Sequence, residues 1–135
     1  MKRWAMVIVV IFTLGTGAQV FASAQDKVKE ASERAAKDYL QHGLVLSAEG
    51  QDEAAVKSFQ KVVAMMPQWA EAHSLLGSSL ARAGNLRDAE AELRKAVTLK
   101  PDYAEGWYYL GQFLKEQGKE AEAQEAFRKA QQYAR

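Results

Sequence analysis

The fold is decided by two stretches of sequence that match one another: residues 67–84, PQWAEAHSLLGSSLARAG, and residues 101–118, PDYAEGWYYLGQFLKEQG. They lie 34 residues apart and share a proline, an Ala-Glu pair, a Leu-Gly pair and a final glycine at the same places. The same register continues backward to Gly43, Ala55 and Phe59. A period in this range indicates a solenoid, in which each unit buries its apolar face only against its neighbours.

Each period is expected to contain two helices. Residues 70–83 and about 87–99 have the apolar spacing of amphipathic helices. Gly84-Asn85 separates them, because glycine suits the end of one helix and asparagine can cap the start of the next. Asp102, with Glu105 three residues later, has the form of a capping box and is predicted to start the following helix.

Glycine recurs inside the first helix of every period, at Gly43, Gly77 and Gly111. A glycine in the middle of a helix costs about 1 kcal/mol relative to alanine. We therefore expect a packing reason for these three glycines, namely that the partner helix approaches too closely to leave room for a Cβ atom.

The repeating unit resembles the tetratricopeptide repeat, a helix–turn–helix unit of the same length. The third period supplies the residues that carry the resemblance most completely: Trp107, Leu110-Gly111, Leu114, Ala123, Phe127 and Ala130. The resemblance implies an all-α fold, an α-solenoid of three helix–turn–helix units wound into a right-handed superhelix. The units are expected at residues 36–69, 70–103 and 104–135.

The N-terminal segment has the organisation of a secretory signal peptide. Residues 1–24 contain a short basic start, an apolar run from Trp4 and the sequence Ala22-Ser23-Ala24. Cleavage there would leave residues 25–35 as a charged helical lead-in and would place the protein in the bacterial periplasm. The alternative is an uncleaved helix that anchors the protein in the inner membrane, since residues 4–24 carry no charge.

Composition and motifs argue against several functional classes. A formal net charge of +1 gives no basic footprint for nucleic acid, and the absence of cysteine excludes thiol chemistry. The only histidines, His42 and His73, stand at core-type positions of the period and are expected to be neutral core residues with a local hydrogen bond. No catalytic triad, metal site, phosphate-binding loop or cofactor site is predicted, so the chain is not expected to be an enzyme.

The resemblance implies a concave groove lined by the first helix of each unit. Many of the positions that the family directs inward are apolar, aromatic or small and polar here, and the set differs from the basic clamp that some members use for peptide carboxylates. Tyrosine is common at binding hot spots because its ring buries a large area while its hydroxyl stays hydrogen-bonded. The predicted partner-binding residues are Lys37, Leu40, Gln41, Leu44, Ser74, Ser78, Arg82, Tyr108, Tyr109 and Gln112.

These observations lead to one main functional expectation and two alternatives. The main expectation is a non-catalytic adaptor of the bacterial cell envelope that binds a protein or peptide partner in the groove. The first alternative is a membrane-tethered interaction module. The second is a self-assembling structural protein, because the last helix carries Ala126, Phe127, Ala130 and Tyr133 on a face that is expected to be incompletely covered.

Overall fold

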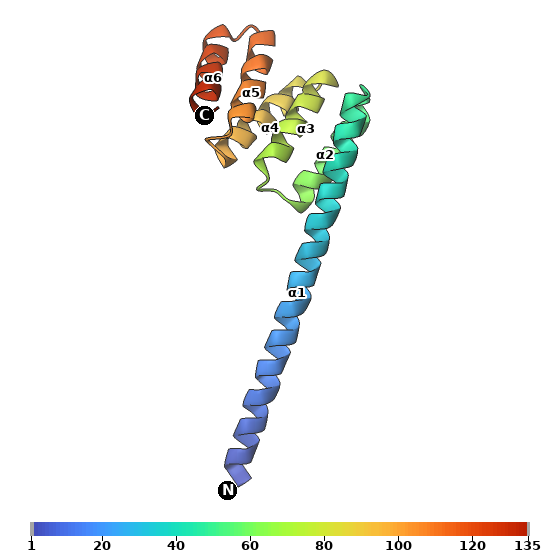
Figure 1. Cartoon of the computed structure of the whole chain (residues 1–135), viewed down its shortest axis with the longest axis vertical. Helices are drawn as coiled ribbons and strands as arrows, with labels where there is room; N and C mark the ends of the chain where they lie inside the picture. Colours follow the sequence, from blue (N-terminus) through green and yellow to red (C-terminus); the bar gives the residue numbers. More distant parts are fainter. Residues whose placement is uncertain (1, 135) are drawn as a thin grey trace. The chain divides into compact units, whose positions relative to one another are not determined.

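The computed structural model describes residues 2–134, with side chains from residue 16 onward, and these residues form six helices (Figure 1). The segments 1–35 and 36–135 form separate compact units. The helices are α1 (Lys2–Ala48), α2 (Asp52–Met65), α3 (Ala70–Arg82), α4 (Leu86–Leu99), α5 (Ala104–Glu116) and α6 (Glu120–Tyr133). No strand occurs in this described part of the chain, so the expected all-α fold is confirmed.

The N-terminal unit consists of the part of α1 that ends at Ala35. Most of the predicted signal sequence, residues 1–15, lies outside the part of the chain whose side chains are described. Among the residues that were described, no helix combines the length and the apolar character needed to cross a membrane.

The compact unit from Ala36 onward is built from three helical hairpins that follow one another in space (Figure 1). The first hairpin pairs residues 36–48 of α1 with α2, since Ala36 packs with Val62 and Gly43 lies against the Phe59 ring. The second pairs α3 with α4, and the third pairs α5 with α6. Each hairpin also packs on the next, through contacts of α2 with α3 and of α5 with both α3 and α4. The architecture is therefore the expected solenoid, with hairpins as its units.

Glycine permits the close contact between the two helices of every hairpin. A Cβ atom on Gly43 would lie 2.6 Å from the Phe59 ring, and one on Gly111 would lie 2.8 Å from the Phe127 ring. On Gly77 it would lie 2.7 Å from the Leu93 Cγ and 3.0 Å from the Ala89 carbonyl oxygen. The three distances to side chains are shorter than real Cβ contacts, and the distance to the Ala89 oxygen is tighter than most of them, so the packing reason expected from the sequence is confirmed.

The turns inside the hairpins follow the sequence closely. Gly84 ends α3 with a φ of 88°, a conformation that glycine adopts without strain. Asn85 then caps α4, because its side chain accepts a hydrogen bond from the Asp88 backbone N–H at 3.4 Å. The break that was predicted at these two residues is confirmed.

The connection between the second and third hairpins differs from the prediction. The residue that precedes α5 is Tyr103, and no side chain caps the helix there, so the predicted capping box of Asp102 and Glu105 is wrong. The Tyr103 ring packs against the backbone of α5, where a Cβ atom on Gly106 would lie 2.5 Å from it. An aromatic ring therefore fixes the start of α5 in place of a hydrogen-bonded carboxylate.

Alanine at position 77 tests the close approach within a hairpin. We expect Gly77→Ala to destabilise the protein by about 1–2 kcal/mol, because overpacking against the Leu93 branch point and a backbone oxygen outweighs the gain in helix propensity. Guanidinium unfolding followed by circular dichroism measures the change. The neighbouring Ser78→Ala is the control and should change stability by less than about 0.5 kcal/mol. Equal stability of the two variants would contradict the packing argument.

Tyr103 makes stability depend on alkaline pH. Burial, with added repulsion from Glu105 and Glu71, raises the pKa of Tyr103 to about 12, whereas an unfolded tyrosine titrates near 10. The folded state therefore holds a proton that the unfolded state loses, so this contribution is complete below pH ~10 and is lost as the pH rises toward about 12.

The stability difference between the wild type and Tyr103→Phe isolates the contribution of the Tyr103 proton, because the lysines are the same in both proteins. As the pH rises through this window, we expect the wild type to lose about 1–2 kcal/mol of stability relative to Tyr103→Phe. This range is smaller than the pKa shift alone implies, because water reaches part of the ring and screens its charge. Urea unfolding at a series of pH values measures it. A difference that is constant with pH would contradict the assignment.

Candidate partner-binding surface

The predicted groove residues come from three helices and differ in their exposure. Four lie on α1, three on α3 and three on α5, as the resemblance to the repeat family implied. The exposed ones are Lys37, Gln41, Leu44, Arg82, Tyr108 and Gln112, and the half-buried ones are Leu40, Ser78 and Tyr109. Nine of the ten side chains therefore present at least part of their surface to solvent.

Ser74 is the exception, because it is 0% exposed. Its helix, α3, packs against α5 of the next hairpin. A small side chain at this place lets the two helices meet, which removes Ser74 from the surface available to a partner. The sequence-based assignment of Ser74 to the groove is therefore corrected.

Arg82 is held at the junction of the first two hairpins. Its Nε donates to the Asp52 carboxylate at 2.6 Å, and its Nη2 donates to the Ser47 hydroxyl. This arginine joins the end of α3 to the end of α1 and the start of α2. Its guanidinium therefore has a structural role beside any role in the groove.

Aromatic side chains concentrate on the third hairpin. The Tyr108 and Tyr109 ring centroids lie 6.1 Å apart in an edge-on arrangement, and Tyr108 lies 5.9 Å from the ring of Phe127 on α6. The Tyr108 hydroxyl accepts a hydrogen bond from Gln112 Nε2 at 2.7 Å, and 47% of Tyr108 remains exposed. These rings form an accessible apolar patch with polar edges.

A depression of about 490 Å³ lies beside these rings, and we call it the C-terminal pocket. It is formed by one side of α5 and one side of α6. The residues that line it are Ala104, Glu105, Tyr108, Tyr109, Phe127, Ala130, Gln131 and Ala134. Of the predicted groove residues, only Tyr108 and Tyr109 belong to it.

Reasoning from the groove alone missed the α6 side of this pocket. The family pattern directed attention to first helices, whereas Phe127, Ala130 and Gln131 stand on a second helix. Sequence inspection did mark the last helix as incompletely covered. The outcome is divided, since Tyr133 is 36% exposed and Phe127 is half-buried, but Ala126 and Ala130 are buried, at 2% and 8% exposure.

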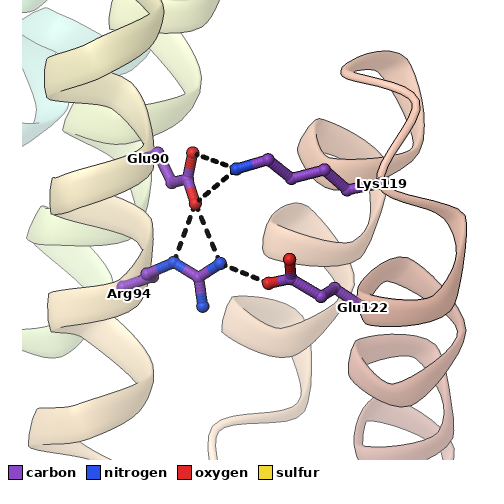
Figure 2. Close-up of polar contacts among 4 residues, drawn as sticks. All are labelled: Glu90, Arg94, Lys119 and Glu122. Carbon is purple, nitrogen blue, oxygen red and sulfur yellow. Dashed lines mark hydrogen bonds and ion pairs between the residues drawn. The ribbon is translucent and has the colours of Figure 1, made fainter.

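Four charged residues, Glu90, Arg94, Lys119 and Glu122, connect the second and third hairpins (Figure 2). Arg94 on α4 bonds Glu122 on α6 at 2.6 Å and Glu90 on its own helix at 2.8 Å, and Lys119 reaches Glu90 at 3.1 Å. Partial burial opposes ionisation of Glu90, but hydrogen bonds from Lys119 and Arg94 hold its pKa below the usual value. Exposed pairs of this kind contribute at most about 1 kcal/mol each, so the network mainly fixes how the two hairpins stack.

The two histidines have different environments. His73 is 2% exposed and fully hydrogen-bonded, with Nε2 lying 2.8 Å from the Pro67 carbonyl oxygen and Nδ1 lying 2.5 Å from a Glu92 carboxylate oxygen. The expectation of a buried, hydrogen-bonded residue is confirmed for His73, while its expected neutral state stays a prediction. The expectation of burial is wrong for His42, which is exposed because no helix within the unit from Ala36 onward covers that face of α1.

Trp107 stands 34 residues after His73 and makes the same backbone contact. Its indole N–H donates to the Pro101 carbonyl at 2.8 Å, as Nε2 of His73 does to Pro67. This shared hydrogen bond explains why a histidine can replace an aromatic residue here. In the part of the chain that is described, no cluster of three or more His, Asp or Glu side chains could hold a metal ion.

The geometry defines a class of protein, stacked helical hairpins with open faces. A family model of the tetratricopeptide repeat matches residues 33–104 and 75–135. The chain therefore belongs to the tetratricopeptide repeat family. A search of curated proteins gave no match.

Among solved structures, MamA 41-end from Desulfovibrio magneticus RS-1 is 27% identical, with a TM-score of 0.69 over 81% of this chain. This chain spans 62% of the length of that MamA chain. The second TPR of Spaghetti, bound to an HSP90 peptide, is 18% identical and has a TM-score of 0.72 over 79% of this chain and 98% of its own. The TPR2B domain of yeast Sti1, in a complex with pHsp70, is 19% identical, with a TM-score of 0.71 over 74% of this chain and 80% of its own.

Proposed function

We propose that this protein is a non-catalytic adaptor that binds a segment of another protein on the face formed by α1, α3 and α5. The observation that carries the proposal is the aromatic patch on the third hairpin. Tyr108 is exposed there, although burying an aromatic ring is normally favourable, and exposed aromatic side chains that gather in one place mark interaction surfaces.

The fold neighbours support the same class of function. Two of the solved neighbours are complexes, one with an HSP90 peptide and one with pHsp70. Their likeness to this chain lies in the fold, so the chemistry of the partner has to come from this chain's own residues. Those residues are apolar and aromatic on α5, with Leu44 exposed on α1, which favours a segment with apolar anchors over an acidic tail.

We further propose that the adaptor works in the bacterial cell envelope after export. This proposal rests on the sequence of residues 1–24, with its basic start, apolar run and small residues before Gln25. A retained N-terminal helix, which would make the protein a membrane-tethered module, is the competing arrangement. Both arrangements place the hairpins on the same side of the membrane and leave the proposed binding face unchanged.

The groove can be tested with two matched substitutions. Site-specific photocrosslinking from Gln112, an exposed residue of α5, identifies the partner in envelope extracts, and that partner is then purified. We expect Gln112→Arg to weaken its binding at least tenfold, which corresponds to about 1.4 kcal/mol. Gln124→Arg places the same charge on exposed α6 and should leave binding unchanged. Equal affinities of the two variants in calorimetry would remove the groove assignment.

Export is tested by the mass of the mature protein. If the signal sequence is cleaved as proposed, intact mass spectrometry of the protein expressed in a Gram-negative host should give a chain that begins at Gln25. Fractionation should recover this chain from the periplasm. A full-length chain in the membrane fraction would instead establish the tethered arrangement, and a full-length chain in the cytoplasm would contradict both.

A further inference from the structure

The buried ring of His73 faces an oxygen atom with each of its two nitrogens. Nε2 lies 2.8 Å from the Pro67 carbonyl oxygen, and Nδ1 lies 2.5 Å from a Glu92 carboxylate oxygen. A carbonyl oxygen only accepts hydrogen bonds, so the hydrogen of a neutral ring has to stand on Nε2. That would leave a bare lone pair on Nδ1 pointing at the carboxylate, which is repulsive at this distance. The geometry therefore needs a second hydrogen, between Nδ1 and Glu92.

The histidine ring is the better place for this second hydrogen. An ordinary imidazole is a stronger base than an ordinary carboxylate. The Glu92 side chain is also 27% exposed, so water stabilises its negative charge, whereas the His73 side chain is 3% exposed. A protonated ring beside an ionised Glu92 gives a charge-assisted hydrogen bond, which is roughly twice as strong as a neutral one. This arrangement differs from the neutral ring that the sequence alone predicts.

Other charged groups around α3 do not replace Glu92 as the partner of the ring. Lys95 on α4 is exposed and stands one period from Lys61 and Lys129, each of which lies over an aromatic ring in its own hairpin. Its positive charge opposes a protonated ring from a distance, whereas Glu92 favours one through a direct bond. The neighbouring charged residues have other contacts: Asp52 with Arg82, Glu71 with Lys100, Glu90 with Arg94 and Lys119, and Glu105 near Tyr103.

The second hairpin differs from the other two at this place. In the first and third hairpins the residues equivalent to His73 and Glu92 are Tyr39 with Ser58 and Trp107 with Ala126. Trp107 holds the Pro101 carbonyl with an indole N–H, a donor that keeps its hydrogen at every physiological pH. The same backbone contact is therefore permanent in the third hairpin and depends on a titratable ring in the second.

We propose that His73 and Glu92 form a proton-dependent clamp between α4 and the loop that joins the first hairpin to the second. Pro67 lies in that loop, between the end of α2 and the start of α3, so the clamp connects three segments of the chain. When the proton leaves, Nδ1 faces the carboxylate with no hydrogen between them. A rise in pH is then expected to loosen the junction of the first two hairpins and to leave the next junction intact.

The direction of the pH effect follows from counting protons. An unfolded histidine releases its proton above pH ~6.5, while an unfolded glutamate stays ionised there. Below that pH both states hold the proton, so the contribution of the clamp is complete. Above it only the folded state holds the proton, so the folding equilibrium constant falls about tenfold for each pH unit until the folded pair also releases it.

The clamp is tested by urea unfolding of the wild type and Glu92→Gln at pH 6.5 and 7.5. The glutamine amide can donate to Nδ1 of a neutral ring, so this variant needs no additional proton. We expect the ratio of folding equilibrium constants, wild type over variant, to fall about tenfold between the two pH values. Glu53→Gln, which removes an exposed carboxylate of α2, is the control and should keep a constant ratio to the wild type. A constant ratio for Glu92→Gln, or an equal fall for Glu53→Gln, would overturn the inference.

A second variant covers the case in which Glu92→Gln does not fold. His73→Trp combined with Glu92→Ala copies the pair of the third hairpin, so it should hold the Pro67 carbonyl without a titratable group. Its stability relative to the wild type should rise with pH in the same tenfold steps. No change of relative stability with pH in this double variant would count against the clamp.

Two further measurements locate the effect in the molecule. NMR of the ring nitrogens at pH 7.5 should show both nitrogens of His73 protonated, while the exposed His42 gives a neutral ring in the same sample. Hydrogen exchange at pH 8.5 should be faster in residues 62–69 of the wild type than of Glu92→Gln, and equal in the equivalent residues 96–103. A neutral His73 ring, or equal exchange of residues 62–69 in the two proteins, would rule out the clamp.

Discussion

The structure depends on the close approach of two helices at a glycine within each hairpin. Gly43, Gly77 and Gly111 each leave less than 3 Å between a hypothetical Cβ atom and the large side chain opposite. That contact sets the distance between the two helices of a hairpin. It therefore also determines how much apolar surface the hairpin leaves for the next hairpin to cover. Because no hairpin can bury both of its sides alone, stability depends on stacking, and every end of the stack is exposed by default.

The same constraint decides where the side chains of the described hairpins lie. Helical hairpins in series project their side chains outward along extended faces, and they do not bring acids, bases and nucleophiles together in a closed cavity. One buried polar arrangement, His73 between Glu92 and the Pro67 carbonyl, replaces the hydrogen bond that Trp107 makes in the next hairpin. Charged networks such as that around Arg94 link the second hairpin to the third.

Comparison among hairpins separates residues with structural roles from residues available to a partner. Tyr108 and Ser74 occupy the same position of the period, but only the tyrosine is exposed, because α5 covers the serine. His42 and Leu76 are equivalent in the same way, and only the leucine is buried. A position in the repeat pattern therefore does not decide whether a residue is in the core. Its neighbours along the stack decide that.

The sequence by itself determined the period, the helical hairpins, the breaks at Gly84 and Asn85 and the tight contact at the three glycines. These features depend on local backbone preference and on a spacing that is visible in one dimension. Only the tertiary structure decided that Ser74 is buried, that His42 is exposed and that Tyr103 in place of Asp102 starts α5. It alone joined Tyr108 to Phe127 and Gln131 across two helices in one pocket. Burial depends on which helix packs over a residue, and that is a property of the assembled hairpins.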